Sequence, residues 1–168
     1  MIKGIIFDLD MTLVDTSSVF QLRSKRKWSE VYNRLDETKL FDGISNLIAF
    51  SKRKYKIGIV TSSPRKYAER LIDFHDLNIP VLSGYHDTQK HKPDPEPITY
   101  GVKILGLQPE SVIYVGDEIS DIYATKAANC RAVGVTWGIG SINEIDRAQP
   151  DFIAMNVSEL IGWIDNNE

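Results

Sequence analysis

Short apolar runs alternate along the chain with longer stretches in which apolar residues recur at helical spacing. Six apolar runs predict strands, at residues 3–7, 56–60, 81–82, 111–115, 132–135 and 151–155. The first, second and fourth runs are apolar on both faces, which is typical of central strands covered by helices on both sides. Strands that alternate with helices in this way predict an open, mainly parallel α/β sheet.

Helices are predicted between these strands from the spacing of their apolar residues. Their ranges are 44–54, 64–74, 98–105, 118–128 and 157–164. Ser63 is placed to cap the second helix, with Pro64 as its first residue. Gly106 is placed to end the third. The helix boundaries leave short loops at the ends of the strands, where ligands of such sheets bind.

One segment, residues 16–41, interrupts the alternation. It is polar, basic and aromatic, and its apolar set is Phe20, Trp28, Tyr32 and Leu35. The segment looks partly helical but is too short to enclose a core of its own. We therefore expect one domain over residues 1–168, with residues 16–41 as a short helical cap inserted after the first strand.

Composition narrows the class of protein. The 168 residues are 42% hydrophobic and 26% charged, as in ordinary soluble domains, and the net charge of −3 provides no general attraction for nucleic acid or an anionic membrane. Cys130 is the single cysteine, so no internal disulfide can form. The N-terminus lacks a secretory pattern, and no apolar run approaches the roughly 18 residues of a membrane span. We expect a cytoplasmic protein without a nucleic-acid or membrane partner.

Chemically active side chains cluster where the predicted strands end. Because the carboxyl ends of parallel strands share one edge of the sheet, we expect these side chains to converge. They are Asp8 and Asp10 after the first strand, Thr61 and Ser62 after the second, Lys92 in the loop after the third, and Asp117 and Asp121 after the fourth.

Four carboxylates in one pocket repel one another unless a cation compensates. Oxygen ligands of this kind suit Mg²⁺, which takes one or two carboxylates together with phosphate oxygens. Hydroxyl groups, an ammonium group and a helix N-terminus suit the phosphate itself. A carboxylate can attack phosphorus to form an aspartyl-phosphate, and a second carboxylate can carry the proton.

Four motifs in the right order resemble the haloacid dehalogenase superfamily of phosphohydrolases. "DLDMT" resembles the first motif, Thr61 the second, Lys92 in "HKPDPEP" the third and "GDEISD" the fourth. "HKPDPEP" and "GVTWG" are also similar to the phosphoglycolate phosphatase and β-phosphoglucomutase branch. The resemblance implies a three-layer, Rossmann-like core with a cap after the first strand.

The resemblance also implies a role for each matching residue. Asp8 would be the nucleophile, and Asp10 would protonate the leaving group and then activate water. Mg²⁺ would be held by the carboxylates of Asp8 and Asp117 and by the backbone carbonyl of Asp10. The phosphoryl group would be bound by Thr61, Ser62 and Lys92, and Asp121 would support the metal site through water or Lys92.

The sequence departs from this family in two places. Met11 stands where the family has a glycine that eases a tight turn. The cap is shorter than is usual in the branch, which suggests a more open site. Arg23, Arg26 and Trp28 in the cap are candidates for selecting an anionic substrate.

Competing functions stay open at this level. The leading interpretation is a Mg²⁺-dependent phosphomonoester hydrolase acting on a small phosphorylated metabolite. A phosphosugar mutase would need a cap that excludes water, and a receiver-like switch would accept a phosphoryl group without turnover. A catalytically silent binding module is disfavoured by the four intact motifs. Phosphosugars, phosphoglycolate, nucleotides and phosphorylated macromolecules all remain possible substrates, and the oligomeric state is not predicted.

Overall fold

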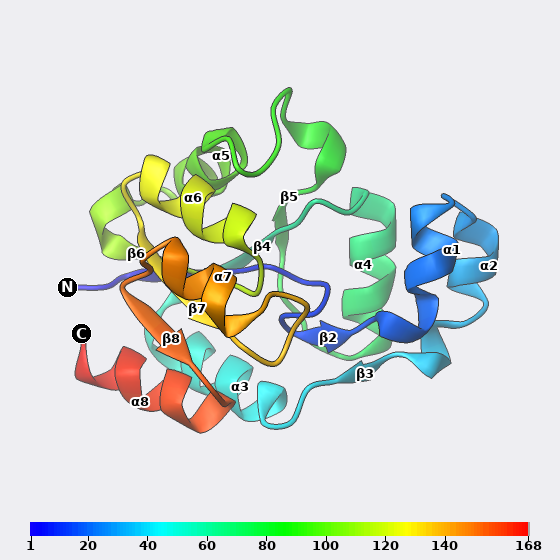
Figure 1. The fold of residues 1–168 in the computed structure, drawn as a ribbon, viewed down its shortest axis with the longest axis horizontal. Coiled ribbons are helices and arrows are strands. Elements are labelled where there is room, and N and C mark those ends of the chain that lie inside the picture. The colour runs from blue at the N-terminus through cyan, green and yellow to red at the C-terminus, as the bar shows by residue number, and fades with distance from the viewer. Residues whose placement is uncertain (168) are drawn as a thin grey trace.

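A sheet of six strands forms the centre of the computed structural model, which describes residues 1–167 (Figure 1). All its neighbouring strands are parallel, and the order is β5-β4-β1-β6-β7-β8. The strands are β1 (Gly4–Phe7), β4 (Lys56–Val60), β5 (Val81–Ser83), β6 (Val112–Gly116), β7 (Arg131–Val135) and β8 (Phe152–Ala154). The prediction of an open, parallel α/β sheet is confirmed. The first, second and fourth predicted strands are β1, β4 and β6, which lie next to one another inside the sheet.

Strand register aligns the carboxyl ends of the three central strands. Phe7 of β1 is paired with Ile59 of β4 on one side and Val115 of β6 on the other. The backbone N–H of Asp8 still donates to the carbonyl of Val115, at 2.8 Å. The residues that follow β1, β4 and β6 therefore emerge at one level of the sheet edge.

Helices cover both faces of the sheet (Figure 1). Ile5 and Phe7 point into a core shared with α3 (Ile44–Lys54), α4 (Arg65–Phe74) and α8 (Val157–Asn166). Ile6 points the other way, into a core shared with α5 (Glu96–Leu105) and α6 (Ile119–Ala127). This alternation along β1 explains why the first predicted strand is apolar on both faces.

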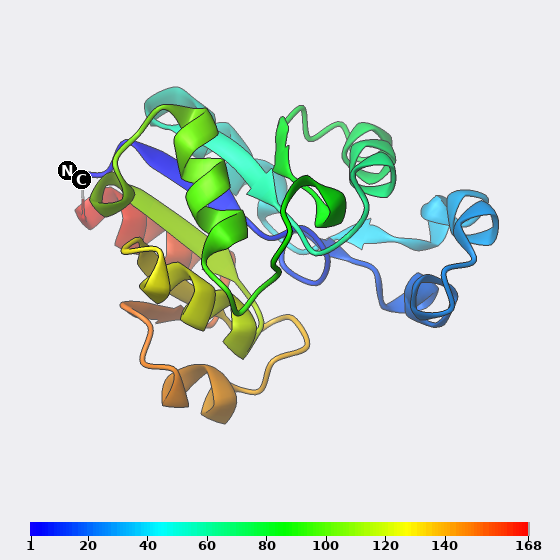
Figure 2. The same cartoon turned by 90° about the horizontal axis from the view of Figure 1, so that it is seen from above.

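The chain between β1 and α3 forms a small lobe, which we call the cap segment, residues 16–41. Its elements, with the strand that precedes it, are β2 (Val14–Asp15), η1 (Ser17–Val19), α1 (Phe20–Ser24), α2 (Trp28–Tyr32), η2 (Leu35–Glu37) and β3 (Lys39–Leu40). The antiparallel pair β2–β3 carries the chain out and back. Figure 2 shows α1 and α2 projecting beyond the end of the sheet, next to α4.

The cap segment packs on α4 instead of enclosing a core alone. Val19, Val31 and Leu35 are buried in the same cluster as the residues of α4. The Trp28 ring lies 5.6 Å from the Tyr67 ring, centroid to centroid. The predicted apolar set of the cap is wrong for one member, because Phe20 is 48% exposed and faces a cavity.

Two helix ends show where sequence patterns succeed and fail. α5 ends at Gly106 as predicted, with φ at +65°, a conformation that glycine adopts at low cost. The predicted start of α4 is wrong, because Pro64 is extended (φ −58°, ψ 139°) and Arg65 is the first helical residue. Ser63 does not cap this helix. Its hydroxyl group has another partner, described below.

The remaining elements are short and were not predicted. They are α7 (Ile142–Arg147), η3 (Tyr85–Asp87) and η4 (Pro109–Ser111), in addition to β2 and β3. Across residues 1–167, none of the helices has the length and apolar character needed to span a membrane.

Candidate active site

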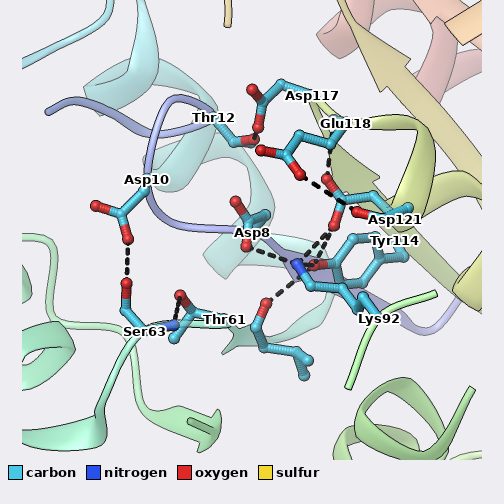
Figure 3. A network of polar contacts seen from close by, with 12 residues as sticks. Asp8, Asp10, Thr12, Thr61, Ser63, Lys92, Tyr114, Asp117, Glu118 and Asp121 are labelled. Carbon is cyan, nitrogen blue, oxygen red and sulfur yellow. Dashed lines mark hydrogen bonds and ion pairs between the residues drawn. The ribbon is translucent and has the colours of Figure 1, made fainter. Parts of the chain in front are cut away.

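Asp8 is the first residue after the central strand and is almost fully buried, with 7% of its surface exposed. Its Oδ1 accepts a hydrogen bond from the Lys92 ammonium group at 2.9 Å (Figure 3). Burial raises the pKa of Asp8 well above its usual range, although Lys92 opposes this. A carboxylate placed here is costly to charge and is fixed in position by rigid strand geometry.

Lys92 lies at the centre of the network in Figure 3. Its Nζ donates to Asp8, to Asp121 Oδ1 at 2.6 Å and to the Tyr114 hydroxyl oxygen at 3.0 Å. Burial alone would lower the pKa of this ammonium group, but Asp121 and Asp8 together raise it well above the usual value. The Tyr114 hydroxyl group in turn donates to the carbonyl of Val60 at 2.9 Å. Lys92 is therefore a fixed positive charge beside Asp8.

Asp117 and Asp121 follow β6 and are both 1% exposed. The Thr12 hydroxyl group donates to Asp117 Oδ1 at 2.9 Å, and the backbone N–H of Ile139 donates to Oδ2 at 2.8 Å. Asp121 Oδ2 accepts from the backbone N–H of Glu118 at 3.0 Å. Both carboxylates are thus oriented by contacts from several loops.

The loop after β7 closes over Asp117. A Cβ atom at Gly138 would lie 2.4 Å from the Cβ atom of Asp117, so only glycine fits at this position without displacement. Trp137 Nε1 donates to the carbonyl of Thr12 at 2.9 Å. The "GVTWG" sequence therefore joins the loops after β1, β6 and β7 around one carboxylate.

Asp8, Asp117 and Asp121 form the one group in residues 1–167 whose positions suit a metal ion, with one oxygen of each within 4.8 Å of the others. Burial, followed by the charge of Asp121, raises the pKa of Asp117 to about 6. Three buried carboxylates face a single ammonium group, so the site lacks positive charge when all three are ionised. The all-oxygen donor set fits a hard divalent cation.

Asp10 belongs to a second, neighbouring group of contacts. Its Oδ1 accepts from the Tyr67 hydroxyl group at 2.7 Å, and its Oδ2 accepts from the Ser63 hydroxyl group at 2.6 Å. Arg23 of the cap segment reaches the same Oδ2, with its Nη2 at 2.8 Å. Figure 3 shows the Asp10 carboxylate against Ser63, outside the contacts around Lys92. Its carboxylate is not part of the metal-suited group.

A cavity of about 130 Å³ lies between these two groups and is lined by Asp8, Asp10, Thr61, Ser62 and Lys92, among others. Thr61 is buried, and its hydroxyl oxygen accepts from the backbone N–H of Ser63 at 3.1 Å. Ser62 is exposed at the rim. The structure therefore brings all the expected strand-end residues except Asp117 to one small, polar cavity, and Asp117 lies next to it in the metal-suited group.

The cap candidates lie beside a second cavity. Arg23, Arg26 and Trp28 all line a space of about 430 Å³ between the cap segment and the core. Arg23 lines the small cavity as well. Arg26 is exposed, whereas the Arg23 side chain is only 18% exposed.

Sequence reasoning missed Ser63, Tyr67, Tyr114 and Thr12. The two tyrosines occupy apolar positions and their rings are fully buried, so the pattern shows only core residues. Ser63 precedes a predicted helix, so the sequence indicates a helix cap and not a contact with Asp10. The one signal for Thr12 is its position directly after the Asp-x-Asp pair.

Comparisons with known proteins agree with this geometry. The haloacid dehalogenase-like hydrolase family matches residues 19–135. Phosphoglycolate phosphatase of Escherichia coli K12 is 32% identical over 147 residues, which cover 84% of this chain and 58% of that protein. The chain thus spans under two thirds of the length of the curated relatives it matches first.

Solved structures show the same fold. CbbY from Rhodobacter sphaeroides, in complex with phosphate, superposes with a TM-score of 0.80 at 19% identity, over 95% of this chain and 96% of that one. A haloacid dehalogenase-like protein from Streptococcus pneumoniae gives 0.78 at 21% identity, over 97% and 98%. Taken with the family match and the strand-end cluster, these results identify the chain as a member of the haloacid dehalogenase-like hydrolase family.

Proposed function

We propose that this protein is a Mg²⁺-dependent phosphomonoester hydrolase that acts through an aspartyl-phosphate on Asp8. The observation that supports this most is the position of Asp8. It is buried at the end of the central strand, held at one oxygen by Lys92, and it lines a polar cavity of about 130 Å³. A rigid carboxylate beside a fixed positive charge suits attack on a phosphoryl group.

In the first step a carboxylate oxygen of Asp8 attacks phosphorus, and the bond from phosphorus to the leaving oxygen breaks. Asp10, protonated for this step, gives its proton to that oxygen. Lys92 and Thr61 offset the charge on the transferring phosphoryl group. The products of this step are the free alcohol and the aspartyl-phosphate.

In the second step water attacks phosphorus and gives its proton to Asp10. The bond from phosphorus to the Asp8 oxygen breaks, which releases phosphate and restores both carboxyl groups. Tyr67 contacts one oxygen of Asp10 and Ser63 contacts the other. These two contacts orient the carboxyl group that carries the proton. Asp10 thereby returns to the protonated form with which the cycle began.

The metal-suited group would hold the cation through Asp8, Asp117 and Asp121, together with the backbone carbonyl of Asp10 that the family resemblance implies. When bound, Mg²⁺ supplies positive charge that balances these carboxylates and the phosphate oxygens. The raised pKa values of Asp8 and Asp117 support this assignment, because a bound cation would offset the burial that disfavours the ionised form of both groups.

The substrate is a small phosphorylated metabolite, in line with the name of the Escherichia coli relative, phosphoglycolate phosphatase. That name does not fix the substrate of this chain, which spans 58% of the relative. The residues that would select a substrate lie in the short cap segment.

Hydrolysis of p-nitrophenyl phosphate tests the proposal. We expect many turnovers with Mg²⁺, almost none after chelation, and none in Asp8→Asn, where the amide is nearly isosteric but not nucleophilic. Asp36→Asn, on the exposed surface of η2, is the matched control and should match the parent protein. A single stoichiometric phosphorylation without turnover would contradict a hydrolase and favour a receiver-like switch.

A further inference from the structure

The cavity of about 430 Å³ adjoins the small cavity beside Asp8. The two cavities share Phe20, Arg23, Ser62 and Ser63 in their linings. A phosphomonoester with its phosphate beside Asp8 would therefore extend its leaving group past Ser63 into the larger cavity. The size and lining of that cavity therefore indicate which kind of leaving group it fits.

The lining of the larger cavity is aromatic and cationic. Its lining includes four rings, which belong to Phe20, Trp28, Tyr85 and His86. It also includes the guanidinium groups of Arg23 and Arg26. No carboxylate or carboxamide side chain is part of the lining. Phe20 and Tyr85 are 48% and 37% exposed, so ring surface is available to a ligand.

These features disfavour a sugar or a two-carbon acid. The side chains in this lining that can accept from sugar hydroxyl groups are limited to serines, Tyr85 and His86, and none of them is a carboxylate. A two-carbon leaving group would leave most of the cavity unfilled, whereas spaces of about 300–1,000 Å³ suit drug-sized ligands. Aromatic and guanidinium surfaces instead favour stacking against a flat ring.

We propose that the substrate is a nucleoside 5′-monophosphate, with its phosphate beside Asp8 and its base among the rings of the larger cavity. This inference rests on the proposed phosphomonoester hydrolysis and names its substrate class. Tyr85 is braced for such a contact, because its ring is stacked on the His91 ring at 4.0 Å. Arg26 lines the same cavity from an exposed position, and its guanidinium group carries donors that suit the acceptor atoms of a base.

The direct test compares uridine 5′-monophosphate with ribose 5-phosphate, which keeps the phosphate and sugar but lacks the base. We expect kcat/KM to be about tenfold or more higher for the nucleotide, as expected for a stacked base. Tyr85→Ala, at a residue that lines the larger cavity but not the small one, should remove most of this difference by raising KM for the nucleotide.

Two further variants make the test independent of one substitution. Arg26→Met, at an exposed position, should also raise KM for the nucleotide alone. Tyr123→Ala removes an aromatic residue that is 47% exposed but lies outside both cavities. It should leave kcat/KM unchanged for both substrates.

The outcomes separate the inference from the proposed function. Equal kcat/KM for both substrates, or no turnover of the nucleotide while p-nitrophenyl phosphate is hydrolysed, overturns the nucleotide assignment and leaves the hydrolase intact. Failure to hydrolyse all three compounds contradicts the hydrolase, and the inference with it.

Discussion

The Arg23 guanidinium group lies 2.8 Å from the Asp10 carboxylate. The same side chain donates to the hydroxyl oxygens of Thr16 and Ser63, each at 3.0 Å. Its Nε atom is buried without a hydrogen-bond partner. Arg23 thus ties the cap segment to Asp10 and to the loop after β4, so the cap helps to position the proposed acid/base.

Arg23→Met should lower kcat for p-nitrophenyl phosphate about tenfold with little change in KM, because Asp10 loses a contact that orients it. The sequence alone makes Arg23 and Arg26 equal candidates for selecting an anionic substrate. The structure separates them, since Arg26 is exposed and only Arg23 reaches Asp10. Lys25→Met, directly after α1, is the control for charge. An unchanged kcat in the Arg23 variant would refute the positioning role.

Stability of the metal-free protein should depend on pH through Asp117. The folded-state pKa of about 6 lies above the ordinary value of 3.8, because the group is buried and faces Asp121. Between these values the folded chain retains a proton that the unfolded chain has released, so stability falls as the pH rises from about 4 to about 6.

Mg²⁺ should reverse this loss, because the cation binds ionised carboxylates. The increase in Tm on adding Mg²⁺ is expected to be larger at about pH 7.5 than at about pH 5, as measured by thermal unfolding. Asp117→Asn should remove most of the increase at both pH values. An increase independent of pH would place the cation elsewhere.

The close packing of Gly138 on Asp117 makes a second test of the metal site. Gly138→Ala adds a Cβ that must displace Asp117, and it should weaken Mg²⁺ binding about 10–100-fold, as do other changes next to ligands. Gly162→Ala in α8, where a Cβ meets nothing within 4 Å, should leave binding intact and stabilise the fold by about 0.5–1 kcal/mol. Titration calorimetry of both variants gives the comparison.

Met11 is the residue that departs from the family pattern, and its φ of +63° lies in the left-handed region. Met11→Gly should relieve this strain and raise the free energy of unfolding by about 0.5–1 kcal/mol in urea titrations. Asp42→Gly, in a loop where φ is not positive, should lower stability instead. Destabilisation by both substitutions would show that Met11 contributes more by packing than it costs in strain.

Much of the fold could be predicted because the strands are buried and their apolar runs are continuous. α3 has the predicted bounds, residues 44–54. Of the predicted strand-end residues, Asp8 and Thr61 line one cavity, and Asp117 shares the metal-suited group with Asp8. Parallel register brings these residues together without any specific contact between them. β2 and β3 have two residues each, too few to show a period of two.

The contacts that orient the cluster could not be predicted. Tyr67 reaches Asp10 across 57 residues, and Tyr114 reaches Val60 across 54. In the pattern both tyrosines count only as core positions. The Ser63 hydroxyl group donates to the Asp10 carboxylate instead of capping the helix. The local sequence around Ser63 gives no indication that this carboxylate lies within hydrogen-bond distance.

The central claim, a covalent intermediate on Asp8, is tested most directly with Asp10→Asn and p-nitrophenyl phosphate. This leaving group needs little protonation, so the first step should proceed while hydrolysis of the intermediate slows. We predict a rapid burst of one p-nitrophenolate per protein, followed by slow turnover. Mass spectrometry should find one phosphoryl group on the peptide that contains Asp8. The double variant that also carries Asp8→Asn should show no burst. A linear time course without a phosphorylated peptide would contradict the account.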